Sequence, residues 1–256
     1  MELNREVAKR VLEVVDAGLV SGLGNRKPGE MCVEAAVCFA LGLPHGDNPP
    51  CVGSAVRALK IRLNDSNWSS NEARTNGMRR IAIAQLGSVD IDQKEFANIV
   101  ALEVIRQILP IALRAAAKAN PKHSGGLEGS AVACEAATDI PSARAAARAA
   151  NEKARSAAAD AYAAADAYAA YAADAAYAAD AAYAADAAAA AAAYAAADAD
   201  AAADAYAAAD ADAAAAAAYA KRSAIKDRIL TLLADIATNA LIKLGSQGAQ
   251  WLDLCQ

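Results

Sequence analysis

The chain has 256 residues, of which 57% are hydrophobic, and carries a formal net charge of −5. This length allows one or two domains with a sizeable core, and the acidic balance makes general nucleic-acid binding unlikely on electrostatic grounds. The N-terminal string MELNREVAKR lacks the apolar core of a signal peptide, and we find no run of about 20 strongly apolar residues. Five scattered cysteines are typical of reduced thiols. We therefore expect a cytoplasmic protein without membrane association.

The first half of the chain reads as a series of helices separated by Gly- and Pro-rich loops. Apolar residues at helical spacing predict an amphipathic first helix, and Pro110 predicts a kink in the longest one. Ser54 stands where an N-cap is expected, and so does the pair Ser69 and Ser70, followed by Glu72. The predicted helices span 4–20, 30–41, 54–63, 70–86, 94–118 and 127–137.

The last part of the chain contains a clear apolar helix stripe between Ile225 and Ile236. Such a helix is too apolar to stay exposed, so we expect it to return to the head. The strand signal is almost absent. The predicted fold is all-α: a helical head, an alanine-rich hairpin or bundle (α-helical or 3-10) and a C-terminal amphipathic helix. The predicted regions are a head at 1–119, a linker and helix at 120–156, a repeat at 157–220 and the C-terminal helix at 221–256.

Residues 157–220 contain only Ala, Asp and Tyr, and 12 of the 18 Asp and Tyr residues share one triplet phase, where chance would give 6. Alanine favours an α-helix. A 3-10 helix would bring residues three apart onto one face, although long 3-10 runs are uncommon. Disorder of this segment stays an open alternative. The period itself also has a second explanation, the expansion of a repeated codon block without selection for a fold.

The repeat and the rest of the chain carry opposite net charges. It carries −10, and since the whole chain carries −5, the rest carries +5. No Gly or Pro occurs between residues 142 and 244, where one continuous α-helix would be about 155 Å long. A compact chain of this size has a radius of gyration of roughly 18 Å. The segment must fold back, project or assemble with other copies, with reversals expected at 187–193, 198–200 and 210–212. A homo-oligomer follows as an expectation.

Three strings, GEMCVEAAVCFALGLPHGDNPPCV, ALKIRLNDSNWSSNEAR and GAQWLDL, resemble a group of alanine-rich proteins of bacteria and their phages. The resemblance covers roughly the first 120 residues and the last ten. It implies a bacterial or phage origin and a cytoplasmic context. The group has no established activity, so no functional residue follows from it.

Two loops could hold a small anionic ligand or a nucleotide. The loop at 22–29 contains Arg26 and Lys27 before a helix N-terminus, where anions bind readily, but it lacks the Gly-Lys-Ser/Thr ending of a P-loop. The loop at 44–51 contains His45 and Asp47 between prolines, and Arg57 and Lys60 on the next helix would add positive charge. A surface turn and a rigid connector loop are the structural alternatives.

The remaining candidate sites have little support in the sequence. Cys32, Cys38, His45 and Cys51 do not have zinc-finger spacing, and Cys32 and Cys38 lie about 240° apart around a helix. We therefore predict no metal and no cofactor, and no catalytic order of nucleophile and base is present. A basic set between residues 57 and 80 would contact phosphates or the aspartates of the repeat. We expect a non-catalytic, cytoplasmic interaction or assembly protein; the alternative is a protein that binds small anions or nucleotides.

Overall fold

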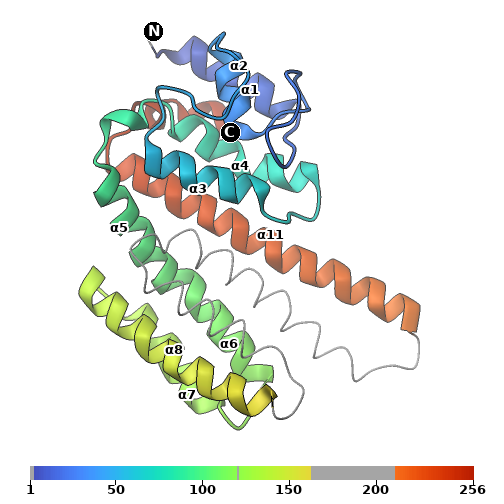
Figure 1. Cartoon of the computed structure of the whole chain (residues 1–256), viewed down its shortest axis with the longest axis vertical. Coiled ribbons are helices and arrows are strands. Elements are labelled where there is room, and N and C mark those ends of the chain that lie inside the picture. Colours follow the sequence, from blue (N-terminus) through green and yellow to red (C-terminus); the bar gives the residue numbers. More distant parts are fainter. Residues whose placement is uncertain (1–2, 120, 163–210) are drawn as a thin grey trace. The chain divides into compact units, whose positions relative to one another are not determined.

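The computed structural model describes residues 3–119, 121–162 and 211–256 (Figure 1). Within these residues the elements are α-helices, short 3-10 helices and one π-helical segment, and there is no strand. Two isolated bridges pair Leu19 and Gly24 with Met31. The predicted all-α class is confirmed.

The chain divides into two compact units. The first unit joins residues 1–100 to residues 230–256, and the second comprises residues 101–229. The last part of the chain therefore belongs to the same unit as the first hundred residues. The division falls at residues 100 and 101, inside a continuous helical segment, whereas the sequence suggested a boundary near residue 120.

The first unit contains four α-helices before the division. Three of the four have an N-terminus capped by a side chain. The Asn4 side chain accepts a hydrogen bond from Val7 N (3.0 Å), and Ser70 Oγ accepts one from Ala73 N (3.0 Å), as predicted. The helices are α1 (Arg5–Asp16), α2 (Val33–Ala40), α3 (Ser54–Asp65) and α4 (Asn71–Ala84).

The expected cap at Ser54 is wrong, because Gly53 occupies the N-cap position of α3 and Ser54 is the first helical residue. Gly53 N donates to the buried Ser88 Oγ at 3.0 Å. A Cβ at position 53 would lie 2.2 Å from the Gln93 side chain. Close packing against Gln93 thus selects glycine here and leaves the α3 N-terminus without a side-chain cap.

Trp68 lies in the polar loop between α3 and α4, and its side chain is buried in the core of the first unit. Its Nε1 donates to Leu63 O at 2.9 Å. Its ring lies against Gly77 of α4, where an added Cβ would come within 2.3 Å of the indole. The loop is polar in composition, yet it delivers a large apolar group to the interior.

The C-terminal 3-10 segment η3 (Gln247–Cys255) completes the first unit by binding the end of α4. Ser246 Oγ donates to Ala84 O at 2.7 Å, and Gly248 N donates to Leu86 O at 2.6 Å. A Cβ at Gly248 would lie 2.0 Å from a backbone oxygen, that of Ile83. The backbones meet too closely there for any residue except glycine.

The second unit contains η2, a π-helical segment (Val104–Ile108), followed by α6 (Leu109–Ala119), α7 (Ser124–Glu135) and α8 (Ile140–Tyr162). The π-helical segment ends just before Pro110, which lacks an N–H and whose ring would clash with the carbonyl of Arg106 in a regular α-helix. A widened turn relieves that clash. The expected disturbance at Pro110 is therefore present as a π-helical turn in the preceding residues.

The helical segment Gln93–Lys118 includes α5 (Gln93–Glu103) and runs into α6. By length and composition it is able to cross a membrane, and within the described residues it is the single segment that meets this criterion. The sequence expectation that the chain has no membrane span therefore stays a prediction. Half of its most apolar window is buried, and a core helix of a soluble protein meets the same criterion.

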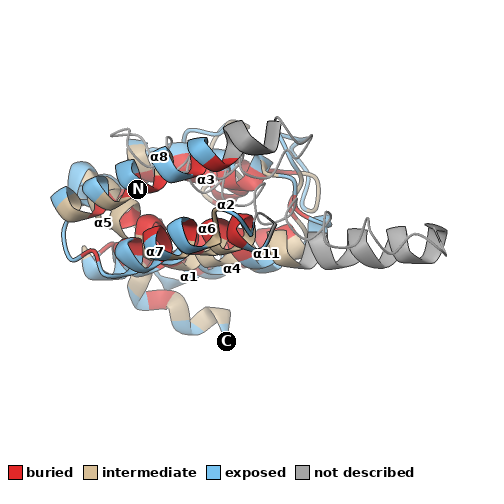
Figure 2. Ribbon diagram, turned by 90° about the horizontal axis from the view of Figure 1, so that it is seen from below, coloured by how far each residue is buried: buried red, intermediate tan, exposed pale blue. Residues whose placement is uncertain are grey.

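Among the residues of α8 whose burial the structure describes, those before residue 158, the buried face is made of alanine alone. Figure 2 shows buried residues along one side of this helix and exposed residues along the other. The spacing of the buried positions alternates between four and three residues, which is the spacing of a coiled-coil seam. They are Ala143, Ala147, Ala150, Ala154 and Ala157, each fully buried.

Both ends of the repeat are α-helical. Residues 157–162 finish α8, and residues 211–220 begin α11 (Ala211–Lys243). The rest of the repeat, residues 163–210, lies outside the described residues. The choice between α-helix, 3-10 helix and disorder there, and the reversals expected at 187–193 and 198–200, therefore stay predictions.

Candidate functional site

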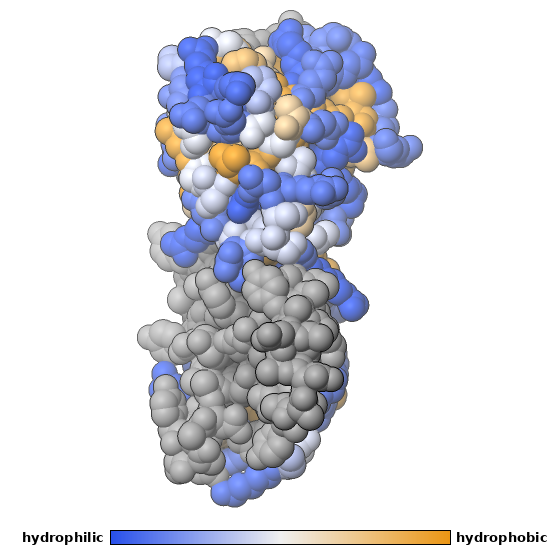
Figure 3. Space-filling view, turned by 90° about the vertical axis from the view of Figure 1, so that its right-hand side faces the viewer, coloured by the Kyte–Doolittle hydropathy of each residue, from blue (hydrophilic) through white to orange (hydrophobic). Residues whose placement is uncertain are grey.

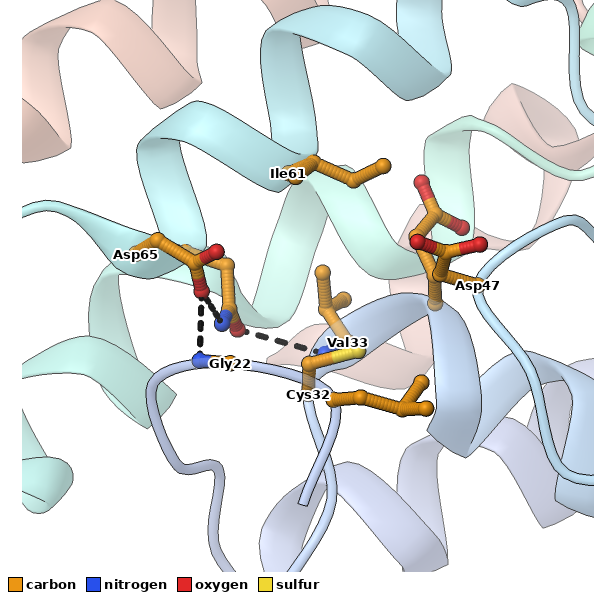
Figure 4. A pocket seen from close by; sticks show the side chains of 9 residues that line it. Gly22, Cys32, Val33, Asp47, Ile61 and Asp65 are labelled. Atoms are coloured by element: carbon orange, nitrogen blue, oxygen red, sulfur yellow. Dashed lines mark hydrogen bonds between the residues drawn. The ribbon is translucent and has the colours of Figure 1, made fainter.

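The first unit contains a small cavity between the 22–29 loop, the start of α2 and the end of α3 (Figure 4). Its volume is about 30 Å³. A cavity needs roughly 10–15 Å³ to hold one water molecule, so it accepts a group of that size or slightly larger. Asp47 and Asp65 lie at opposite sides of it, with Ile61 on α3 and Cys32 and Val33 at the start of α2.

The Asp65 side of the cavity is fixed by hydrogen bonds between three segments. Asp65 Oδ1 accepts from Gly22 N (2.7 Å) and from Asn64 Nδ2 (2.8 Å). Asn64 is fully buried, and its Oδ1 accepts from Val33 N at 3.2 Å. Its amide also donates to Val20 O at 2.9 Å. Asn64 thus holds Val20 and the α2 N-terminus against the end of α3, and Asp65 holds Gly22 of the 22–29 loop there (Figure 4).

A buried ion pair adjoins the cavity. Lys60 Nζ of α3 lies 2.9 Å from Glu34 Oε1 of α2, and both side chains are 0% exposed. Glu34 lines the cavity. Among the described residues neither carboxylate oxygen has a geometrically sound hydrogen bond, so the contact with Lys60 is a charge pairing and Oε2 has no donor at all.

Burial disfavours the charged form of both members of this pair. Loss of water raises the pKa of the Glu34 carboxyl, and the Lys60 charge opposes that shift. Loss of water also lowers the pKa of Lys60, and the Glu34 charge opposes this. Burial thus disfavours the charged form of each partner, and the opposite charge of the other partner favours it.

Of the sequence-predicted site residues, the structure brings Asp47, Arg57 and Lys60 together around Glu34. Arg57 Nη1 lies 3.9 Å from Asp47 Oδ1, which is a salt-bridge distance but too long for a hydrogen bond. Arg57 and Asp47 both act electrostatically on Glu34. The cluster thus alternates two carboxylates with two cations.

The other predicted residues hold the loops together. Arg26 Nη2 donates to Leu43 O at 3.2 Å, and His45 Nε2 lies 3.0 Å from Gly24 O, so both side chains join the 22–29 loop to the 44–51 loop. Lys27 Nζ pairs with Glu30 Oε1 at 2.6 Å. Each of the proposed cations therefore has a partner within the protein, which gives little support to an anion site.

The cysteine thiols are poorly suited to nucleophilic chemistry. Burial is the main cause that raises the pKa of Cys32 and Cys51, and it raises the pKa of Cys38 to about 11. The Cys32 Sγ accepts a hydrogen bond from Ala35 N (3.3 Å) as the N-cap of α2. No group of three or more His, Cys, Asp or Glu side chains in the described part of the chain is arranged to hold a metal ion.

The basic set between residues 57 and 80 finds partners inside the first unit. Arg79 binds Asp16 at 2.7 Å and 3.0 Å, and Arg80 Nη1 lies 3.0 Å from Asp235. Arg74 is buried and donates to Asn64 O at 2.8 Å. Contact between this set and the aspartates of residues 163–210 lies outside the described residues.

Sequence reasoning missed Glu34, Asn64 and Asp65. A signal for Glu34 was present, because it is the single charged residue of the apolar helix α2. In α3, Lys60 shares the buried face with Val56, Leu59 and Leu63. A lone acid in one apolar helix and a lone base on the buried face of another suggest a buried pair.

Comparisons with known proteins give no function for the site, so its chemistry alone indicates what it can do. No protein-family model matches the chain, and neither a curated protein nor a solved structure matches it. The cavity combines carboxylates, a fully buried amide and one apolar wall, and it offers no activated nucleophile. This arrangement is suited to binding rather than to covalent catalysis.

Proposed function

We propose that this chain is a non-catalytic, cytoplasmic helical interaction protein of bacterial or phage origin that associates with copies of itself through alanine-faced helices. The observation that carries the proposal is the buried face of α8, where each buried position through residue 157 is alanine. Side-chain size at the contact sets how closely two helices approach, so such a face favours close contact between backbones. The 157–220 sequence has the same alanine-rich composition.

A second small-residue face lies on the outside of α7. Gly125, Gly129, Val132 and Ala136 are exposed, and they follow the same alternation of four and three residues. An added Cβ at Gly125 or Gly129 would meet nothing within 4 Å. Val132 is 57% exposed and is the one large apolar side chain among these four residues. We call these four residues the outer α7 face.

The charges of α7 leave this outer face neutral. Glu128 and Glu135 both pair with Arg114 of α6, at 3.4 Å and 2.6 Å. Figure 3, in contrast, shows mostly hydrophilic surface with smaller apolar patches over the described residues that are visible on that side. A neutral seam of small residues around one valine suits a helix of a second copy, packed by the same close contact that α8 uses inside the chain.

The oligomeric state of the full chain tests this proposal. We expect light scattering after size exclusion to give a mass above 26.0 kDa, the mass of one chain, and to fall toward it on dilution. Val132→Glu places a charge in the seam and should shift the equilibrium to monomer, because an unpaired charge at a helix contact is costly.

Ala149→Glu is the matched control, since Ala149 is an exposed alanine of α8 outside the outer α7 face. It should leave the mass unchanged. A monomeric wild type over the whole concentration range would refute self-association. An oligomer that survives Val132→Glu unchanged would refute the outer α7 face as its interface.

A further inference from the structure

The exposed side of α8 carries a row of arginines. Arg144, Arg148 and Arg155 are exposed, and Asn151 lies half-buried between the second and the third. These positions are four, three and four residues apart, so on an α-helix they fall within about 60° of one another. Each follows one of the buried alanines of α8 by one residue. We call these four residues the α8 polar row.

Positive charge is in excess on this part of α8. Residues 140–157 contain four bases and one acid, so their net charge is +4 − 1 = +3. The acid, Glu152, lies about 70° around the helix from the centre of the α8 polar row. The fourth base, Lys153, lies on the other side of the helix, beside Gly126 of α7. The row itself therefore contains cations and one amide, and no carboxylate.

Other arginines of the second unit are balanced by acids that lie close in the sequence or on the next helix. Arg106 Nη1 lies 3.1 Å from Glu103 Oε1. Arg114 lies 3.4 Å from Glu128 and 2.6 Å from Glu135. The α8 polar row has no acid at its own positions, so the carboxylates that balance its charge come from outside the row.

The chain supplies an acidic segment directly after this helix. Residues 163–210 contain eight aspartates and no Lys, Arg or His, so the segment carries a charge of −8. It begins directly after Tyr162, the last residue of α8. A segment joined by so short a connection acts at an effective concentration in the millimolar range. A separate acidic or phosphate-bearing partner would have to compete with these aspartates for the row.

We infer that the α8 polar row binds aspartate carboxylates of residues 163–210 of the same chain. A guanidinium group binds a carboxylate through two parallel hydrogen bonds, and the Asn151 amide offers a further N–H donor. From Arg144 to Arg155 the row is about 16 Å long, which gives room for several carboxylates. This inference is independent of self-association through the outer α7 face.

Amide hydrogen exchange of the full chain, measured by mass spectrometry over residues 163–210, tests the inference. A segment held by its side chains opens less often, so its amides exchange more slowly. The triple variant Arg144→Gln, Arg148→Gln, Arg155→Gln should exchange about tenfold faster than wild type at low salt, the combined effect of three exposed ion pairs. In 1 M salt, where the Debye length is about 3 Å, the two should exchange alike.

Lys153→Gln is the matched control, because Lys153 is an exposed base of the same helix that lies outside the row. Arg148→Gln should speed exchange over residues 163–210, whereas Lys153→Gln should leave it unchanged. Exchange over α7, which packs on α8, shows whether each variant keeps its fold. Should the triple variant lose protection in α7 as well, the salt dependence of wild type and the two single variants decide the matter.

The inference is overturned if wild type and the folded triple variant exchange alike at low salt, or if Arg148→Gln and Lys153→Gln behave alike. It is also overturned if the protection of residues 163–210 in wild type is lost on dilution, because the aspartates would then belong to a second copy. Binding of a DNA duplex by wild type and not by the triple variant, with equal exchange in both, would assign the row to phosphates instead.

Discussion

The interior of the first unit and the buried face of α8 in the second unit are made of different kinds of side chain. The first unit fills its interior with large residues such as Phe96, Met31 and Ile81, and places among them the fully buried Glu34 and Lys60. In the second unit, α8 contributes to the interior through alanine alone. The first design depends on filling volume and pairing charge, while the second depends on keeping side chains small. Opposite substitutions should therefore damage the two.

The largest effect should follow from breaking the buried pair of the first unit. Lys60→Met leaves Glu34 buried without a counter-charge, which should lower the free energy of unfolding by about 3–5 kcal/mol. Urea denaturation followed by circular dichroism measures this loss. The Glu34→Gln, Lys60→Met double variant should be more stable than Lys60→Met. If the single variant is as stable as wild type, Lys60 is neutral in the fold and the pairing of charge has no role.

Removing volume from the first unit should cost nearly as much. Ile81 is 0% exposed, and Ile81→Ala should lower the free energy of unfolding by about 2–5 kcal/mol, through lost burial and a cavity. Val89→Ala is the control: Val89 is 49% exposed, and its truncation should change stability by less than about 0.5 kcal/mol. Equal effects of the two variants would mean that this interior is loosely packed.

Adding volume should damage the second unit instead. Ala150 is fully buried in α8, and Ala150→Leu should cost about 1–3 kcal/mol because α7 and α8 cannot stay in close contact around it. The same change at the exposed Ala149 should cost less than about 0.5 kcal/mol. Thermal unfolding of the pair measures the difference. A stabilised Ala150→Leu variant would show that the alanine face leaves space unfilled.

Local chemistry made much of this fold predictable from sequence. Ser70 caps α4 as predicted, and the helices appear where the apolar spacing placed them. The Ser54 prediction failed because Gly53 must lie against Gln93, a contact with a residue 40 positions away in the chain that no local pattern records. The unit division at Val100 was equally hidden, because a continuous helix carries no boundary signal.

The site was predictable only in part. Asp47 was singled out in a rigid loop, and Arg57 and Lys60 were singled out for positive charge beside that loop; the three do lie around Glu34. The pairing of these bases was not evident, because the sequence does not say which acids approach them. Glu34 reaches Lys60 through the packing of α2 on α3, and Asn64 closes the cavity by joining three segments.

The smallest effects should come from exposed ion pairs, and they should be equal in both units. Arg5 pairs with Asp253 in the first unit, and Arg114 pairs with Glu135 in the second. In each case the arginine lowers the pKa of the carboxyl below its ordinary value. Such a group stabilises the fold above its ordinary pKa, and its contribution is lost as the pH falls through the lowered value.

Asp253→Asn and Glu135→Gln should therefore each reduce stability slightly at pH 7, because water screens these exposed charges. Below the ordinary pKa values of 3.8 and 4.5, respectively, the difference from wild type should fade. Thermal unfolding of the two variants and of wild type, at pH 7 and in acid, measures these stability differences. Trp251 fluorescence reports on η3. A loss from Asp253→Asn as large as that from Ile81→Ala would contradict this ranking. The ion pair between the two ends of the chain would then hold η3 in place, and the first unit would differ from the second in its surface as well as in its core.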